Sequence, residues 1–355
     1  MITIALSYRN RDLSIVKNCL ESLEIQTNKQ FRVILVNYGS FKSYTEGLNT
    51  LVEKFKFVNV INCLTEKQLW CKSRAINIAL KKCETPYFFV GDVDMIYHPR
   101  FIEFLLHLKE EYDTVYFQVG FLSSIESKKN KDFFNYVIDF KSAKEATGMT
   151  LYQTQILKSI NGYDEFYNGW GSEDTDVHVR LQNANKEVFY FNTDILMLHQ
   201  WHAKGYRSKD SKAPFHPNLE AINQKYLEFT KETQKTIANT KFNWGEYNDQ
   251  DYIQLENIDR SFSITNELPC IKGFVNSTLL ELKDLVVFVS VKKHDDYKSF
   301  KQKAKKVLGK KTKVYLTMQE INNLLLEVII TNLRTCPYKL MFNKDLQEIT
   351  LIIKL

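Results

Sequence analysis

The sequence lacks the cysteine pattern and the apolar segments of secreted and membrane-spanning proteins. Its six cysteines form no CxxC pair and are irregularly spaced, which favours reduced thiols inside a cytosolic protein. No apolar run approaches the ~20 residues that a bilayer-spanning helix needs. The apolar start of the chain, residues 2–6, is too short for a signal peptide and is soon followed by Arg9 and Arg11. We therefore expect a cytoplasmic protein.

The sequence also carries no recognisable nucleic-acid-binding module and only a small excess of positive charge. Lys and Arg number 48 against 42 Asp and Glu, which gives a formal net charge of +6. A surplus of this size is compatible with small anionic ligands or an anionic membrane surface, but net charge bears on solubility and steering rather than on fold. We expect no nucleic-acid partner, and the sequence leaves the oligomeric state open.

What the first hundred residues do contain is a regular alternation of strand-type and helix-type segments. Buried-strand patterns cover 2–8, 31–36, 58–63 and 87–90, and helical patterns cover 13–25, 43–55 and 70–82. Strands without internal alternation that are separated by helices are typical of a parallel sheet covered on both faces. We therefore predict an α/β fold with a Rossmann-like, mostly parallel sheet.

The pattern changes in the second half of the chain. Residues 203–217 favour a polar, mobile loop, and 218–236 favour a helix. After about residue 245, strand patterns return at 284–291, 313–317, 338–342 and 349–354, with a Lys-rich helix at 296–308. We predict a main domain over residues 1–240 and a smaller α/β domain of unknown role over 245–355.

Polar side chains occur just after three of the predicted strands: Ser7, Arg9, Arg11, Asn37, Asp92 and Asp94. In such sheets ligands bind at the carboxyl ends of the strands, so we expect these side chains to converge in space. Two carboxylates one residue apart, Asp92 and Asp94, suit Mg²⁺ or Mn²⁺ held together with substrate phosphates. An ordinary strand-ending turn with solvated acids is the structural alternative.

The segment Gly169–Asp176 combines two glycines, a tryptophan and three acidic residues. The glycines around Trp170 favour a tight backbone that presents the indole ring for stacking on a sugar. Glu173, Asp174 and Asp176 begin a helical pattern, where crowding and partial desolvation raise a carboxylate pKa toward the range of a general base. Helix capping explains one or two of the acids, but it does not explain the Gly-Trp-Gly sequence.

Two histidines, His199 and His202, follow the strand pattern near 188–191. A neutral imidazole is a suitable third protein ligand for the metal. The H-x-x-H spacing lacks the glutamate of a zinc-protease helix, so that class is rejected. A hydrogen-bonded structural histidine is the alternative for each of the two residues.

Arg74 lies in a helical pattern with Asn77 three residues later, so the two side chains share a face. Together with Arg9 and Arg11, the guanidinium group of Arg74 suits a diphosphate or the edge of a base. A solvated helix face is the alternative.

Taken in order, these motifs resemble those of family 2 glycosyltransferases with the GT-A fold. The order is closest to that of the β-1,4-galactosyltransferases and the bacterial chondroitin-polymerase-like enzymes. The resemblance covers roughly residues 1–205 and is carried by Ser7-Tyr8-Arg9-Asn10-Arg11, Ser73-Arg74-Ala75, Asp92-Val93-Asp94, Ile160-Asn161-Gly162-Tyr163, Gly169-Trp170-Gly171-Ser172-Glu173-Asp174 and Met197-Leu198-His199. Each motif is weak alone, and the shared order and spacing make the signal strong.

The resemblance implies an inverting transfer of a sugar from a nucleotide diphosphate donor, with Asp174 as the base on the acceptor hydroxyl. It implies Asp94 and a histidine as ligands of Mn²⁺ or Mg²⁺, with Asp92 beside them, and His199 fits the ligand position better than His202. The expected donor site, for a uridine diphosphate sugar, comprises Ser7, Arg9, Arg11, Asn37, Arg74, Asp92 and Trp170. Trp170 and Glu173 are expected to line the site of a saccharide or lipid-linked saccharide acceptor.

The second strand departs from the family pattern. It ends in Asn37-Tyr38-Gly39-Ser40, where many members have Asp-Asp-Gly-Ser, which leaves the base of the nucleotide open. The alternative functions are a retaining glycosyltransferase or a nucleotidyltransferase with the same metal site, and a non-catalytic sugar-binding protein.

The C-terminal domain contains a strongly basic segment. Residues 292–313 hold ten Lys against two Asp. We hypothesise that this segment contacts an anionic membrane surface where a lipid-linked acceptor lies. A solvated helix face is the alternative.

Overall fold

The computed structural model of the chain describes residues 1–203 and 214–355, which form two compact units. The first comprises Met1–Cys63, 70–203 and Asn218–Tyr247, and the second comprises Leu64–Leu69, 214–217 and Asn248–Leu355. Most of the polar loop expected over 203–217 lies outside the described residues. None of the helices within the two described ranges has the length and hydropathy of a bilayer-spanning segment.

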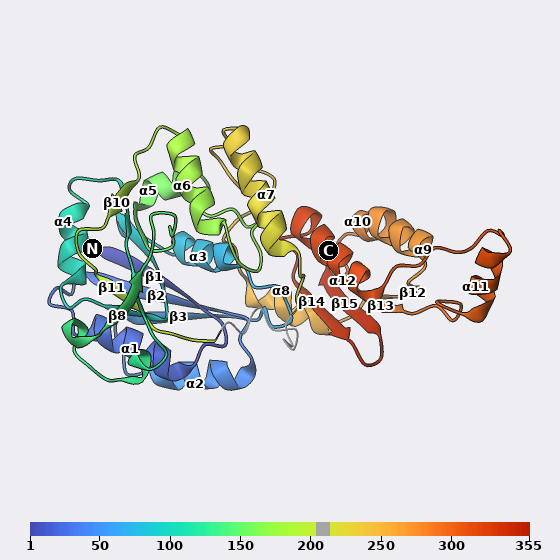
Figure 1. Cartoon of the computed structure of the whole chain (residues 1–355), viewed down its shortest axis with the longest axis horizontal. Coiled ribbons are helices and arrows are strands. Elements are labelled where there is room, and N and C mark those ends of the chain that lie inside the picture. The colour runs from blue at the N-terminus through green and yellow to red at the C-terminus, as the bar shows by residue number, and fades with distance from the viewer. Residues whose placement is uncertain (204–213) are drawn as a thin grey trace. The chain divides into compact units, whose positions relative to one another are not determined.

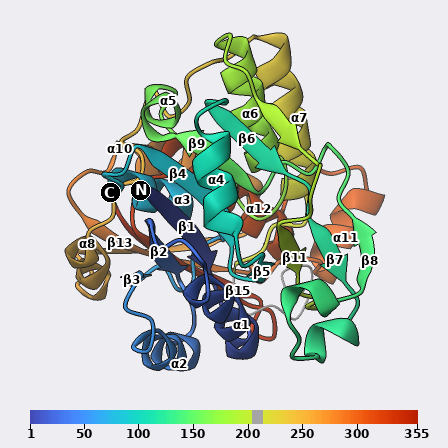
Figure 2. The same ribbon diagram turned by 90° about the vertical axis from the view of Figure 1, so that its left-hand side faces the viewer.

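The first unit is built on a large, mostly parallel sheet (Figures 1 and 2). Its strands, in spatial order, are β10 (Phe189–Phe191), β6 (Thr114–Phe117), β9 (Thr150–Gln153), β4 (Tyr87–Asp92), β1 (Ile2–Tyr8), β2 (Phe31–Tyr38) and β3 (Val58–Cys63). Only β9 runs antiparallel to its neighbours in this sheet. A smaller sheet in the same unit has the order β5 (Met95–Tyr97), β11 (Met197–His199), β7 (Gly120–Leu122) and β8 (Ile138–Lys141).

Helices cover both faces of the large sheet, and alternate side chains of each strand enter two different hydrophobic cores. Ile4 and Leu6 of β1 belong to one core, and Ala5 belongs to the other. The first core includes side chains of α1 (Leu13–Glu24), α2 (Lys42–Val52) and α4 (Phe101–Leu108). The second includes side chains of α3 (Lys72–Lys81), α5 (Thr154–Ser159) and α6 (Glu173–Asn183), and α7 (Leu219–Glu232) packs beside α6.

Figures 1 and 2 show α1 and α2 on one side of the sheet and α3, α5 and α6 on the other. The α/β class with a mostly parallel sheet covered on both faces, predicted from the sequence, is therefore confirmed.

Local signals agree with this arrangement at α1, where Oδ1 of the N-cap residue Asp12 accepts a hydrogen bond from the Ser14 N–H at 2.8 Å. The buried side chains of α1, among them Val16, Leu20 and Leu23, recur at helical spacing.

The second unit is a smaller α/β unit with a four-stranded sheet in the order β12 (Arg260–Thr265), β13 (Val286–Lys292), β15 (Glu348–Lys354) and β14 (Tyr338–Asn343). β12 and β13 are parallel, and the other pairs are antiparallel. The helices are α8 (Asp249–Ile253), α9 (Leu268–Gly273), α10 (Leu279–Glu281), α11 (Phe300–Val307) and α12 (Met318–Asn332); short helical turns lie at Gln254–Glu256 and Phe274–Thr278. The α/β class expected for the C-terminal part of the chain agrees with this unit.

One strand predicted for this unit is not present. Residues 313–317 form only an isolated bridge between Tyr315 and Glu267 and no strand. The strand beside β13 is instead β12, which the sequence pattern did not predict.

The register of the large sheet determines which side chains meet at its carboxyl edge. Ser7 at the end of β1 lies beside Asp92 of β4, and the next residue of β1, Tyr8, lies beside Asn37 of β2. After Asp92 the chain turns directly into β5 of the smaller sheet. The edge where the parallel strands end is therefore also the place where the two sheets of this unit meet.

Candidate active site

Asp92 ends β4 and Asp94 immediately precedes β5, and the two acids contact different groups. Oδ1 of Asp92 lies 3.2 Å from Nζ of Lys72, the first residue of α3. Asp94 is buried and lies against His199, His202 and Arg11. One short turn thus presents one carboxylate to a lysine and the other to two imidazoles.

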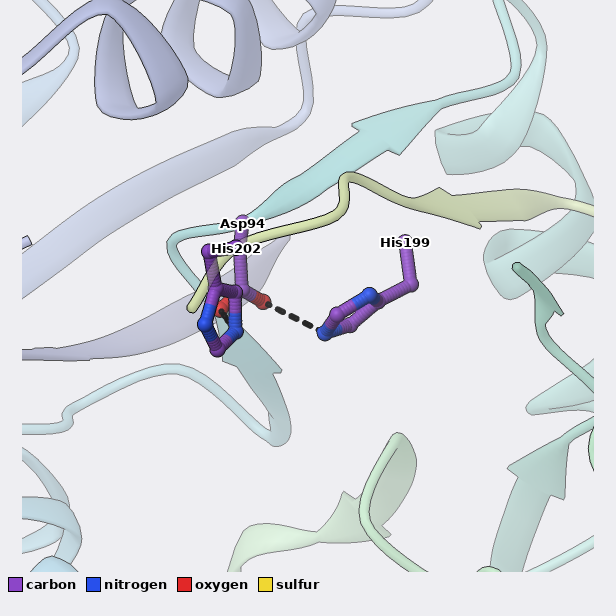
Figure 3. A group of neighbouring side chains, drawn as sticks. All are labelled: Asp94, His199 and His202. Atoms are coloured by element: carbon purple, nitrogen blue, oxygen red, sulfur yellow. Dashed lines mark ion pairs between the residues drawn. The ribbon is translucent and has the colours of Figure 1, made fainter. Parts of the chain in front are cut away.

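Asp94, His199 and His202 form a compact cluster of potential metal ligands (Figure 3). Nε2 of His202 is 3.2 Å from Oδ2 of Asp94, and Nε2 of His199 is 3.8 Å from Oδ1. One ligand atom from each of the three side chains lies within 4.8 Å of the others. Both histidines therefore face Asp94, and the structure does not select one of them against the other.

Backbone pairing holds the histidines opposite Asp94. β11 pairs antiparallel with β5, so that His199 lies beside Met95. The Gln200 N–H donates a hydrogen bond to the Asp94 carbonyl at 2.8 Å. The ring of His199 also stacks on Phe121 with a centroid distance of 4.7 Å, which limits how the imidazole can turn.

The electrostatics of the cluster favour an ionised acid and a neutral imidazole. Burial opposes ionisation of Asp94, but the hydrogen bond from His202 and the neighbouring His199 and Arg11 side chains hold its pKa well below the usual value. Burial lowers the pKa of His199, although Asp94 works against this. Oδ1 of Asp94 is buried and accepts no hydrogen bond within the described part of the chain. A buried carboxylate oxygen without a donor is costly, and a bound cation would satisfy it.

A second cluster joins Asp92 to Asp174 through Lys72. Nζ of Lys72 lies 3.1 Å from Oδ2 of Asp174 and 3.2 Å from Oδ1 of Asp92, and all three side chains are largely buried. Burial alone would lower the pKa of Lys72, but Asp174 and Asp92 raise it well above the usual value. The lysine is therefore charged, and it connects the start of α3 with the start of α6.

Asp174 has the raised pKa that a base at neutral pH needs. Burial is the main cause and raises the pKa of Asp174 to about 7; Lys72 opposes the rise, and Glu173 and Asp92 add to it. The carboxylates of Asp92 and Glu173 lie near Asp174 with only one ammonium group between them, so like-charge repulsion adds to burial in favouring the protonated form of Asp174. Oδ2 of Asp174 is held by Lys72, while Oδ1 is buried without a hydrogen bond from the described residues.

The tight backbone expected before α6 is present. Gly169, Gly171 and Ser172 all have positive φ values, of 78°, 98° and 73°, and such values are costly for residues with a side chain. The Gly169 N–H donates to the carbonyl of Trp70 at 2.7 Å. Trp170 is left about half exposed, and α6 begins immediately afterwards at Glu173.

The third acid of this segment has a structural role. Asp176 is fully buried, with its Oδ2 2.6 Å from Nε of Arg180 and its Oδ1 accepting a hydrogen bond from the Tyr167 hydroxyl. Arg180 also donates to the carbonyls of Ile160 and Gly162. Of the three acids, Asp176 therefore fixes the loop before α6, and Glu173 and Asp174 remain beside Lys72.

The other residues predicted to bind the donor fall into two groups. Arg11 lies against the cluster of Asp94 and the two histidines, with Nη2 3.3 Å from Oδ2 of Asp94, and Ser7 lies beside Asp92 on the neighbouring strand. Arg9 follows Tyr8 at the end of β1 and is partly buried. Arg74 points elsewhere: its Nε lies 3.9 Å from Glu165, and it donates to the carbonyl of Glu246.

Asn37 is buried at the end of β2, where its amide group donates to Thr45 and Asn62. Asn62 occupies the corresponding position on β3, and it donates in turn to Asn49. Asn37 thus belongs to a row of amide hydrogen bonds across the strand ends, and only its Oδ1 is without a donor in the described chain.

Sequence reasoning missed Lys72 and Gly148. Lys72 directly precedes the Ser73-Arg74-Ala75 motif, but nothing in the local pattern distinguishes it from a solvated lysine at a helix start. Gly148 lies against Asp174: a Cβ at this position would be 3.2 Å from Oδ2 of that carboxylate. A side chain there would displace the carboxylate, so the absence of one leaves room for Asp174.

Two family models match the part of the chain that contains these clusters. Residues 3–158 match glycosyl transferase family 2, and residues 131–202 match the N-terminal domain of galactosyltransferase. The first match includes Lys72, Asp92 and Asp94, and the second includes Asp174 and both histidines. The resemblance drawn from the sequence motifs is therefore confirmed. A comparison with curated proteins finds no match.

Solved glycosyltransferase structures are distantly similar to this chain. For S. aureus TarS 1–349 in complex with UDP-GlcNAc the identity is 14%, with 72% of this chain and 70% of that chain covered and a TM-score of 0.49. For mannosyltransferase PcManGT from Pyrobaculum calidifontis, in complex with GDP-Man and Mn²⁺, the identity is 15% and the TM-score is 0.42. The match covers 66% of this chain and 71% of that chain. For GalNAc-T7 with UDP, GalNAc and Mn²⁺, the identity is 11% and the TM-score is 0.48. The match covers 65% of this chain and 48% of that chain. In two other TarS structures the match spans only 60% and 41% of the solved chain. The similarity to all of these solved structures is too low to assign a donor or a metal to this chain.

Proposed function

Because residues 3–158 of this chain form a family 2 glycosyltransferase domain, we propose that the protein is an inverting, metal-dependent glycosyltransferase. The proposed donor is a nucleotide diphosphate sugar, with uridine as the expected base, and the proposed acceptor is a saccharide or a lipid-linked saccharide. One observation carries the proposal. Asp94 groups with His199 and His202 in an arrangement that could hold a cation, while Asp92, two residues earlier, is joined through Lys72 to Asp174.

Asp94, His199 and His202 are the proposed ligands of the divalent cation. Their carboxylate and imidazole groups are donor types that Mn²⁺ accepts, and the unsatisfied Oδ1 of Asp94 is the oxygen that gains most from a cation. The cation would neutralise the charge that develops on the departing diphosphate. Asp92 was predicted as a further ligand; since its Oδ1 faces Lys72, we assign it to the donor side of the site.

Asp174 is the proposed general base. Oδ1 of Asp174 accepts the proton of the acceptor hydroxyl as the acceptor oxygen forms its bond to C1 of the sugar. The bond between C1 and the diphosphate oxygen breaks, and its electron pair leaves with the diphosphate. The contact with Lys72 fixes Oδ2 and so orients the free oxygen, and the raised pKa makes the carboxylate a useful proton acceptor near neutral pH.

Trp170 and Glu173 are the proposed acceptor-side residues. Trp170 exposes about half of its surface on a backbone held by the flanking glycines, immediately before the helix that carries Asp174. An exposed indole on a rigid backbone offers a flat apolar surface to the C–H face of a sugar. Glu173 is buried beside Asp174 and adds to its negative environment.

A thermal-shift screen of nucleotide sugars, with and without Mn²⁺, tests the donor and cation sites together. A ligand that binds only the folded state raises the melting temperature, so we expect a stabilising nucleotide sugar whose effect depends on Mn²⁺. Asp94→Asn should remove the Mn²⁺-dependent part. The matched control is Asp139→Asn, since Asp139 is an exposed acid of the same unit. No Mn²⁺-dependent shift with any donor would reject the cation site.

The donor found in this way then tests the reaction. Product with an anomeric configuration opposite to that of the donor, read by proton NMR, supports inversion. Retention of configuration contradicts the proposed role of Asp174, and release of pyrophosphate indicates nucleotidyl transfer instead. Donor binding without transfer or hydrolysis indicates a sugar-binding protein.

A further inference from the structure

Helix α11 of the second unit exposes its apolar side chains and buries a polar one. Phe300 and Val307 are 85% and 87% exposed, and Leu308, which follows the helix, is 67% exposed. Gln302 is buried, and its Oε1 accepts a hydrogen bond from the Lys313 N–H at 3.2 Å. Figure 1 shows α11 at the end of the long connections between β13 and α12.

The spacing of these residues separates the helix into two faces. Phe300 and Val307 are seven positions apart and Leu308 is eight, so the three share one face at 3.6 residues per turn. Gln302 lies on the opposite face. A surface helix of a soluble protein normally turns its apolar face toward the core, and α11 has the reverse orientation within its own unit.

Lysines border the exposed apolar face on both sides. Lys301 and Lys305 follow Phe300 in one direction around the helix, and Lys303 and Lys306 in the other. In the described chain Lys303, Lys305 and Lys306 form no ion pair. Of the ten Lys in residues 292–313, Lys292, Lys301 and Lys313 pair with acids, whereas the charges of the other three lysines on α11 are available to a partner.

This combination fits a lipid surface better than a protein partner. Specific protein interfaces bury about 1,200 Å² or more, far beyond three side chains on an eight-residue helix, and lysine is depleted in them. A short helix with an exposed apolar face bordered by Lys matches a segment that lies in a membrane interface. Long lysine side chains reach headgroup phosphates while their methylene groups remain near the apolar layer.

We propose that α11 and Leu308 form a docking surface for an anionic lipid bilayer. Phe300, Val307 and Leu308 enter the boundary between headgroups and acyl chains, and the bordering lysines contact the anionic headgroups. The surface belongs to the second unit, and its proposal stands independently of the proposed function. It supplies residues for the membrane contact that the basic composition suggested.

Sedimentation of the full chain with lipid vesicles tests the proposal. We expect binding to vesicles of phosphatidylcholine mixed with phosphatidylglycerol, little binding to phosphatidylcholine alone, and loss of binding as salt is raised. Phe300→Ser combined with Val307→Ser should weaken binding at least about tenfold, because more than two methylene equivalents leave the apolar layer. Lys303→Gln combined with Lys306→Gln should weaken binding to anionic vesicles.

Matched controls separate this surface from general hydrophobicity and charge. Leu346→Ser removes another exposed apolar side chain of the same unit, and Lys272→Gln with Lys283→Gln removes two other exposed lysines; neither should affect binding. All variants change exposed residues, so their melting temperatures should equal that of the wild type. Equal binding by the Phe300/Val307 variant, equal loss in the controls, or no vesicle binding by the wild type would each overturn the proposal. Donor binding should be the same in every variant, so this outcome is independent of the transferase site.

Discussion

Nζ of Lys72 lies 3.1 Å from Oδ2 of Asp174, although the two residues are 102 positions apart in the sequence. The contact joins the first turn of α3 to the first turn of α6, and Lys72 also contacts Asp92 at the end of β4. A single ammonium group therefore couples the carboxylate proposed as the base to the carboxylate proposed to face the donor. The charge state of each group depends on the others.

The first prediction concerns the pH dependence of transfer. The pKa of Asp174 is raised to about 7, with burial as the main cause and Lys72 opposing it. A base acts in its ionised form, so kcat/KM should rise as the pH increases through about 7 and level off above it. Asp174→Asn should remove this dependence and lower the rate by about 10²–10⁴-fold while the donor still binds. If kcat/KM of that variant still rose with pH as in the wild type, Asp174 would not be the base.

The second prediction concerns Lys72. Lys72→Met keeps an unbranched side chain but removes the positive charge beside Asp174, which favours the protonated acid and raises its pKa further. The acid limb of the pH–rate profile should therefore move to higher pH, and activity at neutral pH should fall. Lys82→Met is the matched control, because Lys82 is exposed at the C-terminal end of the same helix. If the acid limb of the pH–rate profile stays at the wild-type pH in Lys72→Met, then Lys72 does not influence the pKa of the base.

The third prediction concerns the cation. His199→Ala and His202→Ala should each weaken Mn²⁺ binding, measured by titration calorimetry, since both imidazoles face Asp94. Substitution of a residue that hydrogen-bonds to a metal ligand typically weakens metal binding about 10–100-fold. Loss of a ligand itself should weaken Mn²⁺ binding at least as much. His107→Ala serves as the control because His107 lies exposed on α4. Unchanged affinity in both single variants would remove the histidines from the site.

The fourth prediction separates stability from catalysis among the acids of α6. Asp176→Ala leaves the fully buried Arg180 without its partner, which should cost about 3–5 kcal/mol of unfolding free energy. Urea denaturation should show a large shift of the midpoint, whereas Asp174→Asn should change it much less. Glu187→Ala, at an exposed acid after the same helix, is the control. A wild-type midpoint for Asp176→Ala would mean that this buried pair contributes little.

Much of the fold could be predicted because its signals are local. The strands at 2–8, 58–63 and 87–90 and the intervening helices have the run lengths and spacings that their structures require. The C-terminal unit was less predictable: residues 313–317 carry a strand pattern without forming a strand, and α12 was missed although a capping box at Thr317 and Glu320 marks its start.

By itself, the sequence determined the order of the elements and the residues that end the strands, since periodicity and turn chemistry act over a few neighbouring positions. Only the tertiary structure decided what those residues contact. Asp174 and Asp176 are two positions apart on a helix and so point in nearly opposite directions, one toward Lys72 and the other toward Arg180. Which direction is the site and which is the core depends on the strands and helices packed on each side, and those come from distant parts of the chain.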